Sequence, residues 1–287
     1  METFLPFLAS GTGIGAVYAL SGVGLVVLYR TTGVLNLAYG ALGALAAFVA
    51  WTMIEAGQPA PLAISAGIVA TAAGSLVYGG LIAPRLAYRD RVVRAVGTLG
   101  FALILLGAIG WYWGEAPRRL LLATDKLYLE LWSVRLTYTR ILALITALVM
   151  VAGVALLLRR SRLGLSMRAL ADDRNVSAVV GIKVGTIEMV AWLISGVFAG
   201  ICGIFLGDLV RLEAHLLTFL VVPAIAATIA DRLSGLTETA VAGVLIGVGE
   251  ALLTPIQAIA PYRTAVPFVV ALAAVALLPT HRSVESD

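Results

Sequence analysis

Long apolar runs are the feature that most constrains the fold of this chain. A helix that crosses about 30 Å of hydrocarbon needs about 20 apolar residues. Because the runs are apolar on every side and do not alternate, they predict helices and not the strands of a membrane barrel. They lie at 4–28, 33–54, 60–84, 95–113, 140–158, 189–210, 216–230, 237–254 and 264–279.

Composition indicates that lipid surrounds these runs. Apolar residues make up 61% of the 287 residues, charged residues make up 13%, and the mean hydropathy is +1.01. No compact soluble fold of this length could hide so much apolar surface. We therefore expect an all-α, polytopic integral membrane bundle of about nine (eight to ten) transmembrane helices, as one domain over 1–287. The runs at 216–230 and 264–279 are short, so they could be tilted, re-entrant or broken.

Basic residues predict the orientation of the bundle and argue against nucleic acid as a partner. A net charge of +4 could suggest nucleic acid, but basic residues in a membrane protein usually mark the cytoplasmic side. With the N-terminus outside and the C-terminus cytoplasmic, thirteen of the 20 Lys and Arg fall inside. Trp51, Trp111 and Trp113 then fall at outer ends, in the headgroup layer. The inner group is Arg30, Arg85, Arg89, Arg91, Arg94, Arg159, Arg160, Arg162, Arg168, Arg174, Lys183, Arg232 and Arg282.

The sequence offers no constellation typical of an enzyme or of a metal site. The single cysteine, Cys202, excludes an intrachain disulfide and a cysteine cluster. The two histidines, His215 and His281, belong to no metal-binding pattern, and no phosphate-binding P-loop motif occurs. We expect no catalytic residues, no metal and no cofactor in this chain.

Charge gathers in one central segment, 159–188, which predicts an element outside the bilayer. Asp172 and Asp173 are suited to the first turn of a short helix, where carboxylates accept from free amide groups, and Gly181 to a left-handed stop. The segment predicts a helix of two or three turns, and the alternative is an ordinary solvated loop. On the outer side, alternation within 114–139 hints at a short strand or an interfacial segment.

Glycine spacing predicts close approaches between helices. Gly196, Gly200, Gly203 and Gly207 share one helical face, which would either pack against a neighbour or border a passage. Gly11 and Gly15 indicate helix packing, since no strand precedes them as a dinucleotide fingerprint requires. Glu250 is a carboxylate within an apolar run, so it should face a partner or a wet cavity, be protonated, or else lie near the outer surface.

Three ordered stretches resemble the branched-chain amino-acid ABC transporter permease family. They are GTGIGAVYALSGVGLVVLYRTTGVLNLAYGALGALAAF, RLGLSMRALADDRNVSAVVGIKV and AWLISGVFAGICGIFLG. The resemblance implies a multi-pass permease in the plasma membrane of a prokaryote, with a second, homologous permease subunit, expected to form a heterodimer. It also implies two ATPase subunits that carry ATP and magnesium, and an extracytoplasmic solute-binding protein. The 159–188 loop would then dock on an ATPase through Arg168, Asp172, Asp173, Arg174, Val176, Val179, Val180 and Gly181.

The solute remains open between a hydrophobic amino acid and a more apolar organic acid. Where relatives place His and an acid after Asn-Phe-Ala, this chain has Tyr39 and Ala41, which favours an apolar pathway. We expect Asn36, Tyr39, Ser195 and Glu250 to line the pathway and the four glycines from Gly196 to Gly207 to form a moving seam. A secondary transporter and a membrane scaffold are the alternative functions, although the first would need more intramembrane ion ligands.

Overall fold

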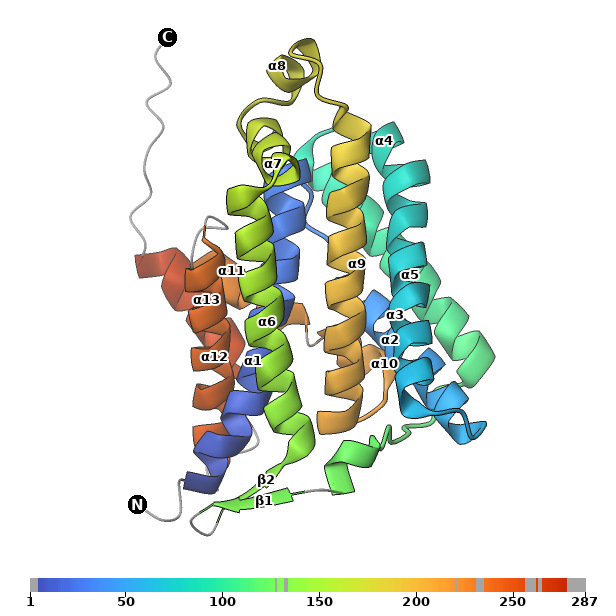
Figure 1. Cartoon of the computed structure of the whole chain (residues 1–287), viewed down its shortest axis with the longest axis vertical. Helices are drawn as coiled ribbons and strands as arrows, with labels where there is room; N and C mark the ends of the chain where they lie inside the picture. The colour runs from blue at the N-terminus through green and yellow to red at the C-terminus, as the bar shows by residue number, and fades with distance from the viewer. Residues whose placement is uncertain are drawn as a thin grey trace.

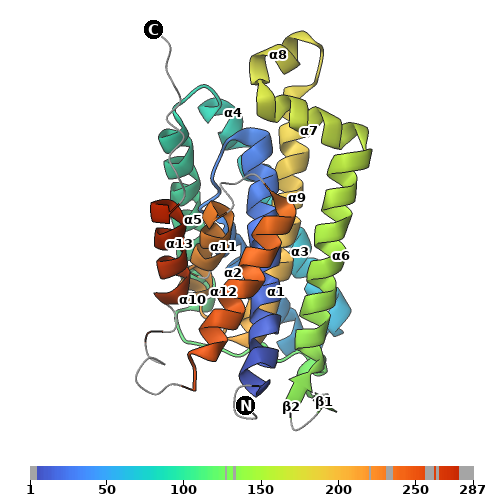
Figure 2. The same cartoon turned by 90° about the vertical axis from the view of Figure 1, so that its left-hand side faces the viewer.

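A computed structural model shows a bundle of helices that run along one long axis, with two short strands at one end (Figures 1 and 2). The structure describes residues 5–126, 128–131, 134–219, 221–230, 235–255, 262 and 265–277. The long helices are α1 (Leu5–Thr32), α2 (Tyr39–Glu55), α3 (Ala60–Val77), α5 (Arg91–Trp113), α6 (Tyr138–Arg160), α9 (Val184–Leu209), α12 (Leu236–Leu252) and α13 (Val266–Leu277). The shorter helices are η1 (Tyr78–Ile82), α4 (Ala83–Leu86), η2 (Ala123–Lys126), α7 (Arg162–Asp172), α8 (Arg174–Val179), α10 (Ala214–Phe219) and α11 (Val221–Ala230).

Within the described residues, five helical segments are long and apolar enough to cross a membrane, which supports a polytopic bundle. They span Pro6–Thr32, Ala60–Leu86, Arg91–Trp113, Tyr138–Arg160 and Val184–Leu209. The run predicted over 216–230 is helical at α10 and α11, and residue 220 between them lies outside the described residues. Arg232, Arg263, His281 and Arg282 lie outside the described residues.

Helix α1 is the centre of the bundle. It packs against α12, α9, α6 and α11, and most of its residues from Gly15 to Leu28 are buried. Because α1 is apolar on every side, it can be surrounded by other helices without burying unpaired polar groups. Figure 2 shows α6 beside α1 and α12 crossing in front of it.

Glycines set the closest approaches in the bundle. A Cβ atom placed on Gly203 of α9 would overlap the backbone of Gly43 in α2, and one placed on Gly196 would lie 2.6 Å from the Cβ atom of Ser75 in α3. On the α1 side, a Cβ at Gly11 would lie 2.8 Å from that of Ala251 in α12. The packing predicted for Gly11 and Gly15 is therefore confirmed, and α12 contributes Gly243 and Gly247 to the same contact.

The two ends of the bundle differ in their secondary structure. At one end, β1 (Tyr128–Leu131) pairs antiparallel with β2 (Val134–Thr137), so of the two structures that the alternation in 114–139 indicates, the strand is observed. We call this the β-hairpin end. At the opposite end α8 projects beyond the long helices (Figure 1), and we call it the α8 end.

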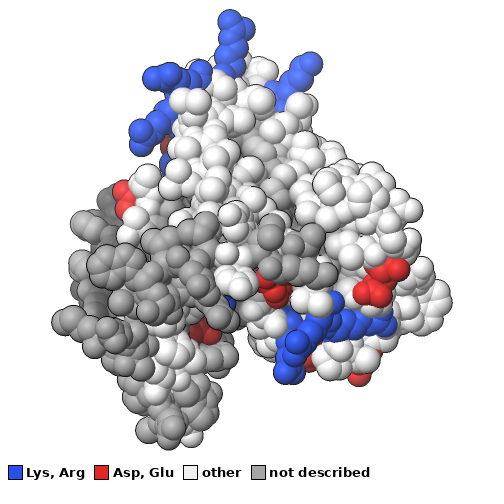
Figure 3. Space-filling model, turned by 60° about the horizontal axis from the view of Figure 1, so that its bottom comes forward, with Lys and Arg blue, Asp and Glu red and all other residues white. Residues whose placement is uncertain are grey.

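Charge is confined largely to these ends. On the face drawn in Figure 3, Lys and Arg side chains stand in two groups separated by uncharged surface. Exposed apolar side chains cover the helices between them, including Leu103 and Ile104 of α5 and Leu148 of α6. Such a surface suits hydrocarbon contact. At the β-hairpin end, the Arg118 guanidinium lies 4.2 Å from the centre of the Trp51 ring.

Candidate functional site

The α7–α8 unit (residues 162–179) holds the polar segment that the sequence singled out. Asp173 Oδ1 accepts hydrogen bonds from the backbone N–H groups of Asn175 (2.7 Å) and Val176 (2.9 Å), so it caps the N-terminus of α8. Gly181 has φ +92°, a left-handed conformation that suits glycine. Asp173 and Gly181 therefore supply the predicted cap and stop, whereas Asp172 is the last residue of α7 and not part of the first turn of α8. The observed helix is shorter than two turns, however, and a separate helix, α7, precedes it.

Three valines on and just after α8 are exposed. Val176 is 58% exposed, Val179 is 88% exposed and Val180 is 75% exposed. Asp172 and Arg168, both on α7, are also exposed. These side chains form a small apolar patch beside charged groups, on a capped helix beyond the bundle. Such a patch has the character of a protein-binding surface.

Arg174 joins the α7–α8 unit to the long helix α9. Its guanidinium forms a close ion pair with the carboxylate of Glu188 and makes a second hydrogen bond of 3.4 Å to Oε2. The side chains are 30% and 12% exposed, respectively, so the pair is partly shielded from water. The same guanidinium lies 5.7 Å from the centre of the Tyr88 ring. Arg174, which we expected to contact an ATPase, thus makes its strong contact within this chain.

Helix α7 rests on a small apolar core of its own. Met167 and Leu170 are buried with Leu28 of α1 and Trp192 of α9. The turn between α6 and α7 is tight, because Ser161 Oγ accepts from the N–H of Gly164 (2.9 Å). Movement of the α7–α8 unit would therefore act on both α6 and α9.

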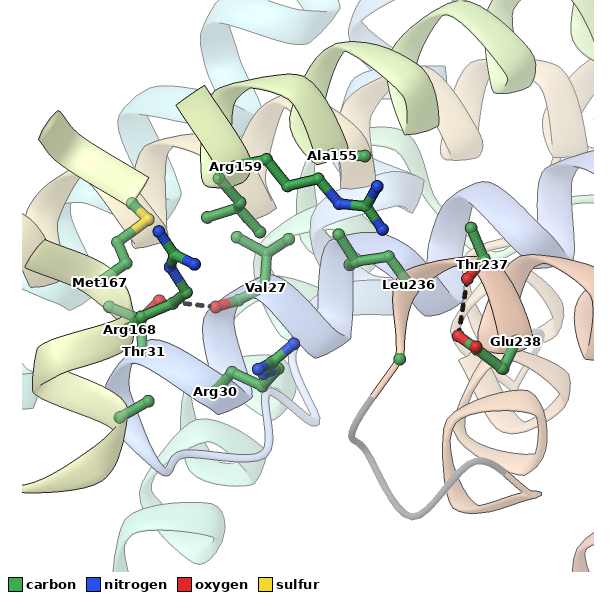
Figure 4. A pocket seen from close by; sticks show the side chains of 13 residues that line it. Val27, Arg30, Thr31, Ala155, Arg159, Met167, Arg168, Leu236, Thr237 and Glu238 are labelled. Carbon is green, nitrogen blue, oxygen red and sulfur yellow. Dashed lines mark hydrogen bonds between the residues drawn. The ribbon is translucent and has the colours of Figure 1, made fainter. Parts of the chain in front are cut away.

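Two cavities flank α7. The first, of about 280 Å³, lies between α1, α6, α7 and α12, and Arg30, Arg159 and Arg168 reach into it around Val27 (Figure 4). The second, of about 500 Å³, includes Arg94, Arg174 and Glu188 in its lining. Ala171 borders both cavities. Between its attachments at Ser161 and Arg174, the α7–α8 unit therefore has an apolar core at Met167 and Leu170 and unfilled space beside Ala171.

A third cavity, of about 560 Å³, lies at the β-hairpin end. Glu250 of α12 lines it, and the buried Tyr18 of α1 donates a hydrogen bond from its hydroxyl to Glu250 Oε2 (3.0 Å). Arg140, at the start of α6, and Arg211, just after α9, line the same space. The apolar part of the wall comes from Phe7, Ile14, Leu209, Val210, Leu216 and Ala251. We call this space the outer cavity.

The other three residues expected along a pathway lie in the interior of the bundle. Asn36 Oδ1 accepts from the N–H of Ala38 (3.1 Å), next to the start of α2. The Tyr39 hydroxyl donates to Cys202 Sγ (3.6 Å), and both residues border a hollow of only about 10 Å³. Ser195 Oγ and Asn36 Nδ2 have no hydrogen-bond partner among the described residues. The structure thus separates Glu250 from Asn36, Tyr39 and Ser195, and the role of all four as pathway residues stays a prediction.

Sequence reasoning missed Glu188, Arg140 and Tyr18. Glu188 stands one residue before the predicted run at 189–210, and a carboxylate at that place could have been paired with the basic residues of the polar segment. The contact of Tyr18 could not be predicted from its neighbours in the sequence, because 232 residues separate it from Glu250.

The fold and these sites define an integral membrane permease: apolar helices, a charged cavity at one end, and a capped helical unit projecting at the other. Residues 7–275 match the family model described as the permease component of branched-chain amino acid transport systems. The chain therefore belongs to the branched-chain amino-acid ABC transporter permease family, as its three motifs predict.

Similar proteins agree with this assignment. The chain is 24% identical to the high-affinity branched-chain amino acid transport system permease protein LivH of Escherichia coli, over 97% of this chain and 96% of that protein. It is 26% identical to the corresponding BraD protein of Pseudomonas aeruginosa, over 86% and 85%. A solved structure titled PsaBC from Streptococcus pneumoniae in complex with Fab has a similar fold, with a TM-score of 0.54 at 11% identity, over 97% of this chain and 92% of that one.

Proposed function

We propose that this chain is the membrane subunit of an ABC importer, which moves a small solute into the cell with ATP hydrolysed by separate subunits. Its relatives are permease proteins of amino-acid transport systems, and its own sequence has no phosphate-binding P-loop. The α8 end then faces the cytoplasm and the β-hairpin end faces outward. The basic residues support this orientation, because those of α4, α7 and the ends of α1 and α6 stand at the α8 end.

The α7–α8 unit is the proposed docking element for an ATPase. The single observation that carries this role is the exposed apolar patch on a capped α8 that is tied to α9 through Arg174 and Glu188. A docked ATPase would cover Val176, Val179 and Val180, and Arg168, Asp172 and Asp173 would lie around that contact. The ion pair would then pass a displacement of α8 to α9, whose glycines contact α2 and α3.

A second permease subunit and an extracytoplasmic solute-binding protein complete the proposed assembly. ATP and magnesium belong to the ATPase subunits in this proposal. The solute is a hydrophobic amino acid or a more apolar organic acid, and it enters through the outer cavity. Gly196, Gly200, Gly203 and Gly207 form the seam along which α9 shifts against α2 and α3.

Docking is tested by substituting the most exposed valine. Val179→Glu places a charge where an apolar contact is expected and disturbs nothing inside the chain. The matched control is Lys183→Gln, which alters an exposed side chain at the same end. We expect Val179→Glu to reduce copurification of the cognate ATPase at least tenfold and to abolish solute uptake in proteoliposomes, while the control behaves as wild type.

Two outcomes would contradict the proposal. Unchanged ATPase copurification with Val179→Glu would show that α8 is not the docking element. Uptake that continues with a non-hydrolysing ATPase variant would instead favour a secondary transporter.

A further inference from the structure

The cavity of about 280 Å³ between α1, α6, α7 and α12 collects positive charge from three helices. Arg30 comes from the last turn of α1, Arg159 from the last turn of α6 and Arg168 from α7. Figure 4 shows their guanidinium groups around Val27. Glu238 of α12 is the only carboxylate among the described residues of the lining, so three positive charges stand against one negative charge. We call this space the arginine cavity.

The carboxylate of the arginine cavity leaves most of this charge uncompensated. The Thr237 hydroxyl donates a hydrogen bond to Glu238 Oε2 (2.7 Å), and Arg159 acts on Glu238 only at longer range. Over the described part of the chain, neither Arg159 nor Arg168 forms an ion pair within 4 Å. A guanidinium stays charged at every physiological pH and carries five N–H donors. Arg159 and Arg168 can therefore donate to an anion.

The arginine cavity lies at the level where hydrocarbon gives way to lipid headgroups. Two segments that are long and apolar enough to cross a membrane, Pro6–Thr32 and Tyr138–Arg160, end beside it. An arginine at the end of such a segment extends its guanidinium toward the polar layer, while its stem stays with apolar residues. The cavity is therefore placed to meet a headgroup, whichever way the protein transports its solute.

Apolar surface leads from the arginine cavity toward the middle of the bilayer. Ala155 of α6 and Leu236 of α12 line the cavity itself. Two turns away on α6, Leu148 shares a helical face with Ala155 and is 71% exposed. Two turns along α12 from Glu238, Leu245 is 65% exposed. Figure 2 shows α6 and α12 on the same face of the bundle, so an acyl chain along this surface places its headgroup among the arginines.

Phosphate is the anion that these donors suit. The planar fork of a guanidinium pairs with two phosphate oxygens at once, and basic pockets between membrane helices are known to bind anionic headgroups. A soluble phosphate would use the arginines alone, whereas a phospholipid also uses the apolar wall. The excess of positive charge favours a lipid with a net negative charge, because the ammonium group of a zwitterionic lipid would be repelled.

From this arrangement we propose that the arginine cavity binds the phosphate of an anionic phospholipid whose acyl chains lie along α6 and α12. Arg159 and Arg168 bind the phosphate oxygens, and Arg30 adds positive charge to the same site. The lipid then connects α6 and α7 with α12 and restrains α7 where Ala171 borders the cavity. Binding needs only the membrane-embedded bundle, and neither an ATPase nor a transported solute.

Two arginines of the cavity can be compared with two that lie close to them in the sequence. The test variants are Arg159→Gln and Arg168→Gln. The matched controls are Arg160→Gln and Arg162→Gln, which remove the same charge from exposed residues that do not line the cavity. Native mass spectrometry of the delipidated full-length chain, titrated with phosphatidylglycerol or phosphatidylcholine of equal chain length, gives the dissociation constant of the first bound lipid.

We expect the wild type to bind phosphatidylglycerol about tenfold or more tightly than phosphatidylcholine. Each test variant should weaken phosphatidylglycerol about tenfold, because one charge-assisted contact is lost. Both controls should bind it as the wild type does. An equal loss in test and control variants would show that general surface charge attracts the lipid, and would overturn the site.

Hydrogen exchange in nanodiscs locates the bound lipid. When phosphatidylglycerol replaces phosphatidylcholine, the backbone amides of α7 (Arg162–Asp172) should exchange more slowly in the wild type and in Arg160→Gln, but not in Arg168→Gln. Exchange in α7 that is the same in both lipids would contradict the proposal.

Glycerol 3-phosphate, which carries the phosphate without acyl chains, separates the two sources of this anion. We expect that it does not displace phosphatidylglycerol at equal concentration. Displacement at equal concentration would assign the arginine cavity to a soluble phosphate compound and overturn the lipid site.

Discussion

Where α1 crosses α12, the two backbones meet through glycines from both helices, whereas α7 stands between two cavities with Ala171 bordering each. The first contact has no space for an added methyl group. The second has space on both sides and is fixed mainly by Ser161, the Met167–Leu170 core and the Arg174–Glu188 pair. Dense packing makes an element rigid, and loose packing makes displacement less costly. The comparison separates a rigid helix contact from an element that can be displaced at lower cost.

One added side chain should break the α1–α12 contact. Of the substitutions in this comparison, we expect this one to have the largest effect, which is a loss of folded protein. In Gly247→Leu the new side chain would overlap the backbone of Gly15, and overpacking of this kind costs about 1–3 kcal/mol or more. We expect loss of monodisperse protein from detergent extracts, measured by size-exclusion chromatography. The control is Gly107→Leu in α5, where no heavy atom lies within 4 Å of an added Cβ. Equal recovery of both variants would contradict the rigid contact.

The link between α8 and α9 can be tested without unfolding the bundle. Arg174→Glu places two carboxylates together at a partly shielded site, so the attachment should be lost. We expect uptake to fall about tenfold or more, while thermal unfolding of the purified chain changes little. The double variant Arg174→Glu, Glu188→Arg restores opposite charges and should recover most of the uptake. A double variant as inactive as the single one would assign the loss to another cause.

Filling the cavities beside α7 should have the smallest effect on uptake. It tests whether the loose packing of α7, in contrast to the α1–α12 contact, matters for transport. Ala171→Leu adds apolar volume at a position that borders both spaces. We expect a modestly more stable α7 and uptake slowed by a few fold, with copurification of the ATPase unchanged. The matched control is Ala152→Leu, an exposed position on α6. Faster uptake in Ala171→Leu would show that the loose packing does not assist transport.

Local chemistry explains which features the sequence could predict. A cap such as Asp173, a stop such as Gly181 and a long apolar run each depend on neighbouring residues only. The Arg174–Glu188 pair was not predicted, because choosing the partner of an arginine requires the fold of the turn between α8 and α9. The same reason applies to Gly247, whose partner Gly15 lies near the other end of the chain.

Amphipathic patterning does not predict how the helices inside the bundle are oriented. Helices that are apolar all around show no preferred face, so their sequences do not say which side meets a neighbour and which meets lipid. Asn36, Tyr39 and Ser195 were chosen as pathway residues because they are polar, and all three lie in the interior, away from the outer cavity.

By itself, the sequence determined that this chain is a multi-pass membrane protein, carries one capped polar element between its apolar runs, and belongs to a permease family. Hydropathy, caps and ordered motifs are properties of contiguous residues, so they can be read without the fold. Only the tertiary structure decided that Tyr18 meets Glu250, that Arg140 crosses α1 at Gly13, and that Arg174 is tied to α9. These contacts join helices whose order around α1 is set by backbone shape and close packing, and a linear pattern does not contain that information.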